Sequence, residues 1–340
     1  DVCSSDLFDM ACKVGIIANP ASGKDIRRLV AFGSVFDNEE KVSIVRRILL
    51  GLEAAGVEEI FIMPDTYGIG ERALDGLGKR QLKPKVNFVE MEIGHGGADS
   101  TLAAQKMQAM SVAAMVVLGG DGTCRAVAKG CGGVPLVPVS TGTNNVFPVM
   151  VEGTIAGLAA GVVGTTSVGV IQRAKKLDIY GREGWRDLAL VDVVVTKETF
   201  IASRALWDME RIEAIAATRA EPHTIGLSAV AGCLSPVAPE EPAGIYLELN
   251  RDKPTVTVLA PVAPGLFSAV PVGSWQRLAL EEKVVLETSD SPRLLALDGE
   301  REVLVRGGEQ VEIVLSAAGP FVVDIAATLQ RGQSQGFFTR

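Results

Sequence analysis

Short apolar runs alternate with helical stretches along the first 150 residues. Apolar runs that predict strands lie at 14–18, 59–63, 86–93, 112–118 and 134–139. Between them, Glu39–Ala55 carries apolar residues at helical spacing, a helix capped by Asp99 or Ser100 runs to Met110, and 124–129 is helical. Strands separated by helices predict a parallel sheet with right-handed crossovers, and therefore an α/β domain of Rossmann-like, three-layer architecture.

The pattern changes after Val151. Small residues at Gly153–Val163 predict a closely packed helix, and one more helix is expected near Arg204–Arg219. The valine-rich runs that predict strands lie at 176–180, 187–195, 244–250, 253–259, 283–287, 302–305 and 310–315. Hairpin-like turns at 181–184 and 306–309 complete a pattern that is typical of an antiparallel β-sandwich.

These patterns divide the chain into segments. Residues 10–148 are predicted to form the α/β domain, residues 149–322 a β-rich domain, and residues 323–340 a C-terminal segment that packs back on the first domain as a short helix or strand. Residues 1–9 read like translated sequencing-adapter DNA, so we expect them to be a non-native extension.

Composition narrows the class of protein. A chain of 340 residues with 47% hydrophobic and 22% charged residues predicts about two well-packed domains. The net charge of −8 argues against nucleic-acid partners and anionic membranes. No apolar stretch reaches the roughly 18 residues of a membrane span. Five scattered cysteines without a CxxC pair indicate free thiols, no structural zinc and a cytoplasmic protein, with Cys124 as a small buried residue.

Two glycine-rich turns follow predicted strands. Gly119-Gly120-Asp121-Gly122-Thr123 comes directly after the run 112–118, and Ser140–Asn145 comes after the run 134–139. Ligands bind at the carboxyl ends of parallel strands, where glycines allow backbone N–H groups to approach phosphate oxygens. The carboxylate of Asp121 among these donors favours phosphoryl transfer, since it could accept a proton from an attacking hydroxyl or hold Mg²⁺.

Other motifs leave alternatives open. Asn19–Lys24 lacks the spacing of a Walker A motif and is either a phosphate-side loop, with Ser22 and Lys24 as contacts, or a solvated turn. The fingerprint Gly68-x-Gly70 is separated from its strand by residues 64–67, and this spacing argues against a pyrophosphate site. His95 is either a phosphate contact or a surface histidine. Asp298-Gly299 is by default a hairpin turn.

Together these motifs resemble the NAD kinase and diacylglycerol kinase superfamily. Four blocks appear in its order: Asn-Pro-x-Ser-Gly at 19–23, Gly-Gly-Asp-Gly-Thr at 119–123, Gly-Thr-x-Asn within 142–145, and Asp-Gly-Glu at 298–300. The segments 140–148 and 296–302 look most like the acetoin catabolism protein X branch, which is commonly labelled ATP-NAD kinase-like.

The resemblance implies an N-terminal nucleotide domain, a C-terminal β-sandwich and a site between them. It implies that Asp121 is catalytic, that Glu300 is the partner acid from the second domain, and that Asp298 is the source of a Mg²⁺ ligand. Nucleotide binding is implied for Asn19, Ser22, Gly119, Gly120, Gly122, Thr123, Thr143 and Asn144. The neighbouring loop residues Gly23, Thr141, Gly142 and Asn145 complete the predicted nucleotide site.

The sequence therefore predicts an enzyme, an ATP- and Mg²⁺-dependent phosphotransferase with an alcohol acceptor. NAD, converted to NADP, is the first acceptor to test, with a link to acetoin catabolism and an expected homo-oligomer. Two alternatives stay open. One is a nucleotide-binding regulatory or accessory protein without catalysis. The other is a lipid kinase of the diacylglycerol type, because the block 141–145 is closer to the lipid-kinase version and no Asn-Glu pair follows the glycine turn, as it does in NAD kinases.

Overall fold

The structure is a computed structural model. It describes residues 12–23, 36–78, 80–94, 96–142, 144–166, 168–197, 209–288, 291–299 and 301–339, and every structural statement below concerns these residues. The predicted extension at 1–9 lies outside them. So do four of the candidate residues named above, which are Lys24, His95, Thr143 and Glu300.

The first domain is built on a mostly parallel sheet with the strand order β3-β2-β1-β4-β5-β18-β6. Only β6 runs antiparallel to its neighbour, β18. The strands are β1 Lys13–Ala18, β2 Glu59–Ile62, β3 Lys85–Phe88, β4 Ala114–Gly119, β5 Leu136–Ser140, β6 Ile171–Arg173 and β18 Phe321–Val323. The all-buried pattern of β4 and β5 is expected for parallel strands that are covered on both faces.

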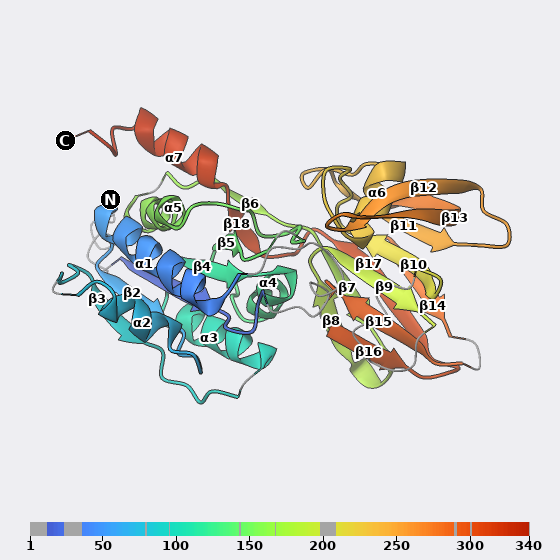
Figure 1. Ribbon diagram of the computed structural model, residues 1–340, viewed down its shortest axis with the longest axis horizontal. Helices are drawn as coiled ribbons and strands as arrows, with labels where there is room; N and C mark the ends of the chain where they lie inside the picture. The colour runs from blue at the N-terminus through green and yellow to red at the C-terminus, as the bar shows by residue number, and fades with distance from the viewer. Residues whose placement is uncertain are drawn as a thin grey trace, which may run out of the picture.

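Helices cover both faces of this sheet, which gives the predicted three layers (Figure 1). α1 (Asn38–Ala54), α2 (Ile69–Asp75) and α5 (Gly153–Thr165) share one apolar cluster with the sheet. α3 (Gly97–Ala109) and α4 (Asp121–Ala128) share the other. α3 begins at Gly97, slightly before the predicted caps, and α4 begins before the predicted residue 124.

The end of the chain returns to the first domain. Val322 of β18 pairs in parallel with Leu136 of β5, and α7 (Ile325–Ser334) then lies against α5, as the red helix beside the green one shows in Figure 1. Both β6 and α5 also belong to this domain, beyond residue 148, where the sequence pattern placed its end. The first domain is therefore assembled from two separate parts of the chain.

The second domain is a sandwich of two antiparallel sheets, as predicted. The larger has the order β12-β13-β11-β10-β9-β15-β16 and the smaller β14-β17-β7-β8. Their shared core includes Leu177, Val193 and Ile313. The strands are β7 Lys176–Tyr180, β8 Arg186–Ala189, β9 Asp192–Thr196, β10 Ile212–Ala217, β11 Ala243–Leu249, β12 Val256–Ala263, β13 Leu266–Ala279, β14 Lys283–Glu287, β15 Arg293–Leu297, β16 Arg301–Val305 and β17 Gln310–Ser316. A short 3₁₀ turn, η2 (Arg182–Gly184), joins β7 to β8.

Three details of this domain differ from the sequence-based prediction. The helix expected at 204–219 is wrong over the part that the structure describes, because Ile212–Ala217 forms the central strand β10, whose side chains are mostly buried; residues 204–208 lie outside the described residues. A helix that the pattern did not indicate, α6 (Leu227–Leu234), covers the outer face of the larger sheet. The single strand predicted at 187–195 is broken into β8 and β9, which lie in different sheets.

Glycines allow α1 and α5 to pack in close contact. A Cβ atom added at Gly157 would lie 2.3 Å from the carbonyl oxygen of Ile48, and one added at Gly51 would lie 2.4 Å from that of Thr154. Both distances are far below any real contact of a Cβ atom, so each helix uses glycine where the other crosses it. The close packing predicted for the small-residue helix is thus confirmed.

Among the described residues, no helix is both long and apolar enough to cross a bilayer.

We expect Gly157→Ala to destabilise the protein by about 1–3 kcal/mol, because the added methyl group overpacks the α1–α5 crossing. Gly97→Ala is the matched control, since a Cβ atom at this position in α3 meets nothing within 4 Å. The control should leave stability unchanged or raise it by up to about 1 kcal/mol, from helix propensity alone. Urea denaturation of both variants measures the difference, and equal midpoints would contradict the close crossing.

The cysteines differ in predicted reactivity. Cys124 and Cys131 are buried, as expected of Cys124, whereas Cys233 is exposed. Burial raises the pKa of Cys131 to about 11. At pH 8, well below that pKa, only about one Cys131 thiol in a thousand is the reactive thiolate. Iodoacetamide under native conditions should therefore label Cys233 much faster than Cys131, as peptide mass spectrometry would show. Equal labelling would refute this burial.

Candidate active site

Three loops meet at the carboxyl ends of neighbouring strands. Residues 19–23 follow β1, the turn 119–123 ends β4, and residues 140–145 follow β5, and these three strands are adjacent and parallel in the sheet. Asn19 donates its side-chain N–H to Thr123 Oγ1 at 3.0 Å, and Thr141 donates its hydroxyl to Ser22 Oγ at 3.2 Å. The structure thus brings together the three predicted blocks of the first domain, from positions more than 100 residues apart in the sequence.

The glycine turn is tight enough to require its first glycine. A Cβ atom at Gly119 would lie 2.5 Å from Thr123 Cβ. The next residue, Gly120, precedes the first turn of α4 and offers no side-chain cap. Because the first N–H groups of a helix have no partner within the helix, this helix start presents donors that suit phosphate oxygens.

The third loop is held by its own side chains. Asn145 donates to Ser140 Oγ at 2.8 Å, and Ser140 donates to the carbonyl oxygen of Gly142 at 2.8 Å. Thr141 also donates its backbone N–H to the carbonyl oxygen of Gly119 at 3.2 Å. Asn144 lies half-buried in the same loop. These contacts give the loop a fixed shape beside the glycine turn.

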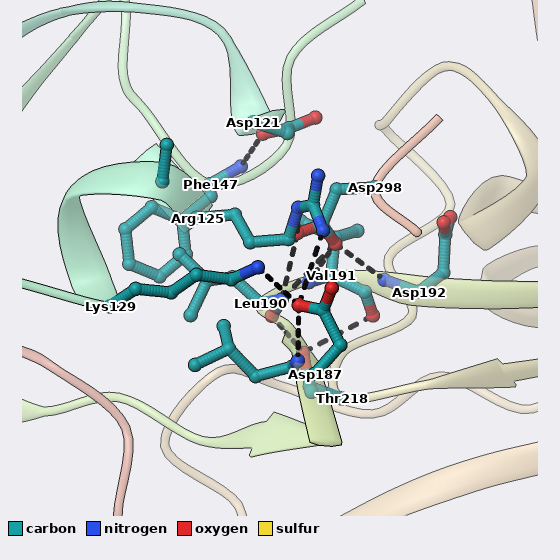
Figure 2. Close-up of polar contacts among 12 residues, drawn as sticks. Asp121, Arg125, Lys129, Phe147, Asp187, Leu190, Val191, Asp192, Thr218 and Asp298 are labelled. Atoms are coloured by element: carbon teal, nitrogen blue, oxygen red, sulfur yellow. Dashed lines mark hydrogen bonds and ion pairs between the residues drawn. The ribbon is translucent and has the colours of Figure 1, made fainter. Parts of the chain in front are cut away.

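Asp121, the predicted catalytic residue, is fixed by backbone amides. One of its carboxylate oxygens accepts from the N–H of Phe147 at 2.7 Å (Figure 2). Both oxygens also lie about 3 Å from the N–H of Val146, at 3.0 and 3.1 Å. The residue is only 9% exposed. The carboxylate therefore joins the start of α4 to the segment that follows the third loop, and its orientation is set before any ligand binds.

A buried lysine organises the first loop from beneath. Lys41 of α1 is 0% exposed. Its ammonium donates to the carbonyl oxygens of Asn19 at 3.0 Å and Pro20 at 3.3 Å, to that of Ser22, and to Asn38 Oδ1 at 3.1 Å. These carbonyls turn inward to a buried cation, which holds the loop in one conformation.

The second domain contributes a buried acid at the junction. Asp298 has a left-handed backbone, with φ of 51°, and its carboxylate accepts from the N–H groups of Leu190, Val191 and Asp192 at 2.8–3.2 Å. These amides lie in the bend between β8 and β9 (Figure 2). Burial raises the pKa of Asp298, while the amides and the charge of Arg125 oppose that rise.

Arg125 of α4 and Lys129, directly after that helix, reach across to Asp298 and to a second acid, Asp187. Arg125 lies 3.7 Å from Asp298 and 3.5 Å from Asp187, and Lys129 forms a closer ion pair with Asp187 (Figure 2). The Nε and Nη1 atoms of Arg125 are buried and make no hydrogen bond among the described residues. Arg125 thus connects the domains through its charge rather than through directional hydrogen bonds.

The structure gives Asp298 contacts other than those expected of a metal ligand. Its side chain is 0% exposed and engaged with three amides and a guanidinium, whereas Asp121 is bound by two amides and stays partly accessible at the glycine turn, which favours a structural role for Asp298 at the junction. The described residues contain no group of three His, Cys, Asp or Glu side chains that could hold a metal ion. The metal role of Asp298 therefore stays a prediction that its contacts do not favour.

The dinucleotide fingerprint is explained without a ligand. The carboxylate of Asp65 accepts from the N–H groups of Tyr67 at 2.8 Å and Ile69 at 3.0 Å, and so occupies the start of α2. A pyrophosphate would have to displace this acid. The geometry therefore agrees with the sequence spacing, which argued against a pyrophosphate site at this motif.

Sequence reasoning missed two cations of the site. Lys41 stands four residues before Val45, on the apolar stripe of the predicted helix, and a lysine on such a stripe signals a buried polar contact. Arg125 stands one helical turn after Asp121, on the same face of α4. No local pattern distinguishes Arg125 from a solvated arginine, because its partners come from the other domain.

Comparisons with known proteins define the class first. Residues 14–166 match the ATP-NAD kinase N-terminal domain, and residues 175–318 match the acetoin catabolism protein X C-terminal domain. The fold is that of NAD kinases. The crystal structure of yeast NADH kinase complexed with NADH aligns with a TM-score of 0.54 at 13% identity, covering 97% of this chain and 89% of that one.

The particular family follows from a curated relative. Acetoin catabolism protein X of Cupriavidus necator is 40% identical over 329 residues, which cover 93% of this chain and 91% of the relative. The chain belongs to the acetoin catabolism protein X family, whose N-terminal domain is NAD kinase-like.

We expect Lys41→Met to lower stability by about 3 kcal/mol or more, because it leaves inward-facing carbonyl oxygens of the first loop without their buried donor. Under the function proposed below, this loop binds nucleotide, so ATP affinity should fall as well, since the loop loses its support. Lys85→Met is the control, because this lysine is exposed and makes only a 3.9 Å ion pair with Glu59. Denaturation and calorimetric ATP titration provide both readouts, and a wild-type result for Lys41→Met would contradict its positioning role.

Proposed function

We propose that this protein is an ATP-dependent phosphotransferase that phosphorylates a hydroxyl group of a small molecule. The observation that carries the proposal is the fixed carboxylate of Asp121. It stands in a glycine turn at the start of α4, bound by the amides of Val146 and Phe147. A carboxylate held in this way is suited to orient or deprotonate an acceptor hydroxyl.

The loops around Asp121 fit the phosphates of a nucleotide. The glycine turn and the uncapped start of α4 offer backbone donors, and Asn19, Ser22 and Thr141 connect the neighbouring loops to this turn. In the proposed site, the backbone of 119–123 and 140–145 surrounds the triphosphate. Positioning and electrostatic stabilisation supply most of the acceleration in phosphoryl transfer.

Magnesium fits this site as a nucleotide-borne ion. Mg²⁺ needs only one or two protein carboxylates when phosphates supply its other ligands, so the lack of a three-residue cluster among the described side chains is compatible with it. Asp121 is the carboxylate on the described side of the site that would hold it. The ion would neutralise charge on the phosphates. Glu300, outside the described residues, stays the proposed partner acid.

NAD is the first acceptor to test. The match of residues 14–166 to the ATP-NAD kinase N-terminal domain and the fold likeness to a kinase solved with NADH support this choice. The curated relative supports a place in acetoin catabolism. Phosphorus NMR with MgATP and a panel of NAD, diacylglycerol and small hydroxylated metabolites would identify the acceptor by a new phosphomonoester. Binding of ATP without any phosphorylated product would instead identify a regulatory or accessory protein.

We expect Asp121→Asn to lower turnover by about 10²–10⁴-fold, because the amide cannot accept the proton of the acceptor hydroxyl. It keeps one oxygen for the N–H of Phe147, so the loss of stability should stay within about 2 kcal/mol. Glu309→Gln is the matched control, since Glu309 also accepts a backbone N–H, from Arg306 at 3.0 Å, in the hairpin between β16 and β17 of the second domain. Full turnover in folded Asp121→Asn would reject the catalytic role.

A further inference from the structure

A cavity of about 710 Å³ lies beside the candidate active site, where the returning end of the chain meets both domains. The start of α5, the strands β6 and β18, the start of α7 and the loop before β11 all contribute to its wall. Its volume lies within the range of roughly 300–1,000 Å³ that is typical of pockets for drug-sized ligands. None of the residues predicted to bind nucleotide lines it.

One wall of the cavity is apolar and reaches the surface. Val149, Met150 and Ile155 line it, and these side chains are 52%, 62% and 39% exposed. Ile325 and Leu329 of α7 face the same space. Exposed apolar side chains that gather around one hollow are unusual on a protein surface and indicate a place where an apolar body binds.

The inner wall carries an arginine whose donors are not all satisfied. Arg219 follows β10, lines the cavity, and stacks over the ring of Phe147, with 5.2 Å from its guanidinium carbon to the ring centroid. Its Nε atom is buried and has no hydrogen-bond partner among the described residues. An arginine side chain has five N–H donors and stays charged in proteins, so a buried donor without an acceptor is costly.

The other charges of the cavity already have partners within the protein. Lys175 donates to the carbonyl oxygens of Ala238 and Glu241 and to that of Ala243, and Arg173 donates to Gly319. Among the acids, Glu241 is paired with Arg277 and Asp324 caps α7, while Glu240 lies exposed at the rim. Arg219 is therefore the inner cation that keeps one buried donor, its Nε–H, without an acceptor among the described residues, although Asp121, Glu221, Glu240 and Asp298 act on its charge from a distance.

We propose that this cavity binds a small amphipathic anion, with its carboxylate or phosphate group on Arg219 and its aliphatic body against α5 and α7. A carboxylate or phosphate presents the oxygen pair that matches a guanidinium, and its hydrogen bonds to that group are charge-assisted. The apolar wall then removes the chain of the ligand from water. This site is separate from the nucleotide loops and goes beyond the proposed kinase activity.

The site has a direct structural connection to Asp121. The ring of Phe147 packs beneath Arg219, and the N–H of the same residue binds the carboxylate of Asp121. A ligand bound to the guanidinium of Arg219 is therefore separated by one side chain from Phe147, the residue whose N–H holds Asp121.

Octanoate is a suitable probe, because it combines a carboxylate with an eight-carbon chain and can be matched by acetate and octylammonium. Calorimetric titration of the full-length protein should show saturable binding of octanoate, at least tenfold tighter than that of either control. Saturating MgATP should not displace it. Equal binding of octylammonium, no binding of octanoate, or displacement by MgATP would each overturn the proposal.

Variants locate the site. Arg219→Gln should weaken octanoate binding at least tenfold, and Met150→Glu should weaken it at least fivefold, because it places a negative charge on the apolar wall. Arg182→Gln removes an exposed arginine of η2 and should bind as the wild type does. Wild-type affinity in both cavity variants would refute the assignment.

A second measurement is independent of how Arg219→Gln folds. A diazirine-bearing fatty acid, activated by light on the wild-type protein, should label peptides that contain 149–155 or 322–329. Labelling confined to other peptides would overturn the site, whatever the variants show. Both measurements are made without an acceptor substrate, so their outcome does not depend on whether the protein transfers a phosphoryl group.

Discussion

The buried carboxylate of Asp298 is the constraint on which the arrangement of the two domains depends. A charge removed from water is costly unless hydrogen bonds and opposite charge replace its solvation. Three consecutive amides provide those bonds, and to point at one carboxylate they must leave the regular strand. The chain bends there, so β8 pairs in the smaller sheet and β9 in the larger.

That bend also builds the contact between the domains. Leu190 and Val191, both fully or almost fully buried, pack in the same apolar cluster as Cys124 and Val127 of α4. The helix that begins with Asp121 is thus covered by the turn that Asp298 holds. Each aspartate uses the same means, a carboxylate that collects the amides of a distant segment, and the two segments meet on one helix (Figure 2).

The sequence predicted what local pattern controls. The parallel sheet and the position of the glycine-rich turns at the carboxyl ends of its strands follow from apolar runs that end in glycine-rich segments. The sequence-based prediction is wrong where long-range contacts determine the secondary structure. Ile212–Ala217 reads as part of a helix, yet burial between two neighbouring strands makes it β10. The run 187–195 reads as one strand, because its own residues do not indicate that the carboxylate of Asp298 binds the amides in its middle.

The same reason separates the predicted from the unpredicted parts of the site. Asp121 could be selected because its glycines mark it, whereas Arg125 and Arg219 owe their surroundings to residues from the other domain or from the returning tail. Asp298 was selected by its motif, but its contacts could not be foreseen, because the number of amides it collects depends on the bend between β8 and β9. Motifs identify residues, and packing determines what these residues contact.

The cations at the junction show how the domains are joined. Hydrogen bonds weaken steeply when distance and angle change, whereas Coulomb attraction falls only with the inverse of the separation. Asp298 is bound rigidly within its own domain by amides, but Arg125 approaches it at 3.7 Å without a hydrogen bond. The acid is therefore fixed within the second domain, while its attraction to the first changes little when the separation shifts by a few tenths of an ångström. This combination keeps the bend precise and leaves the contact between domains tolerant of small movements.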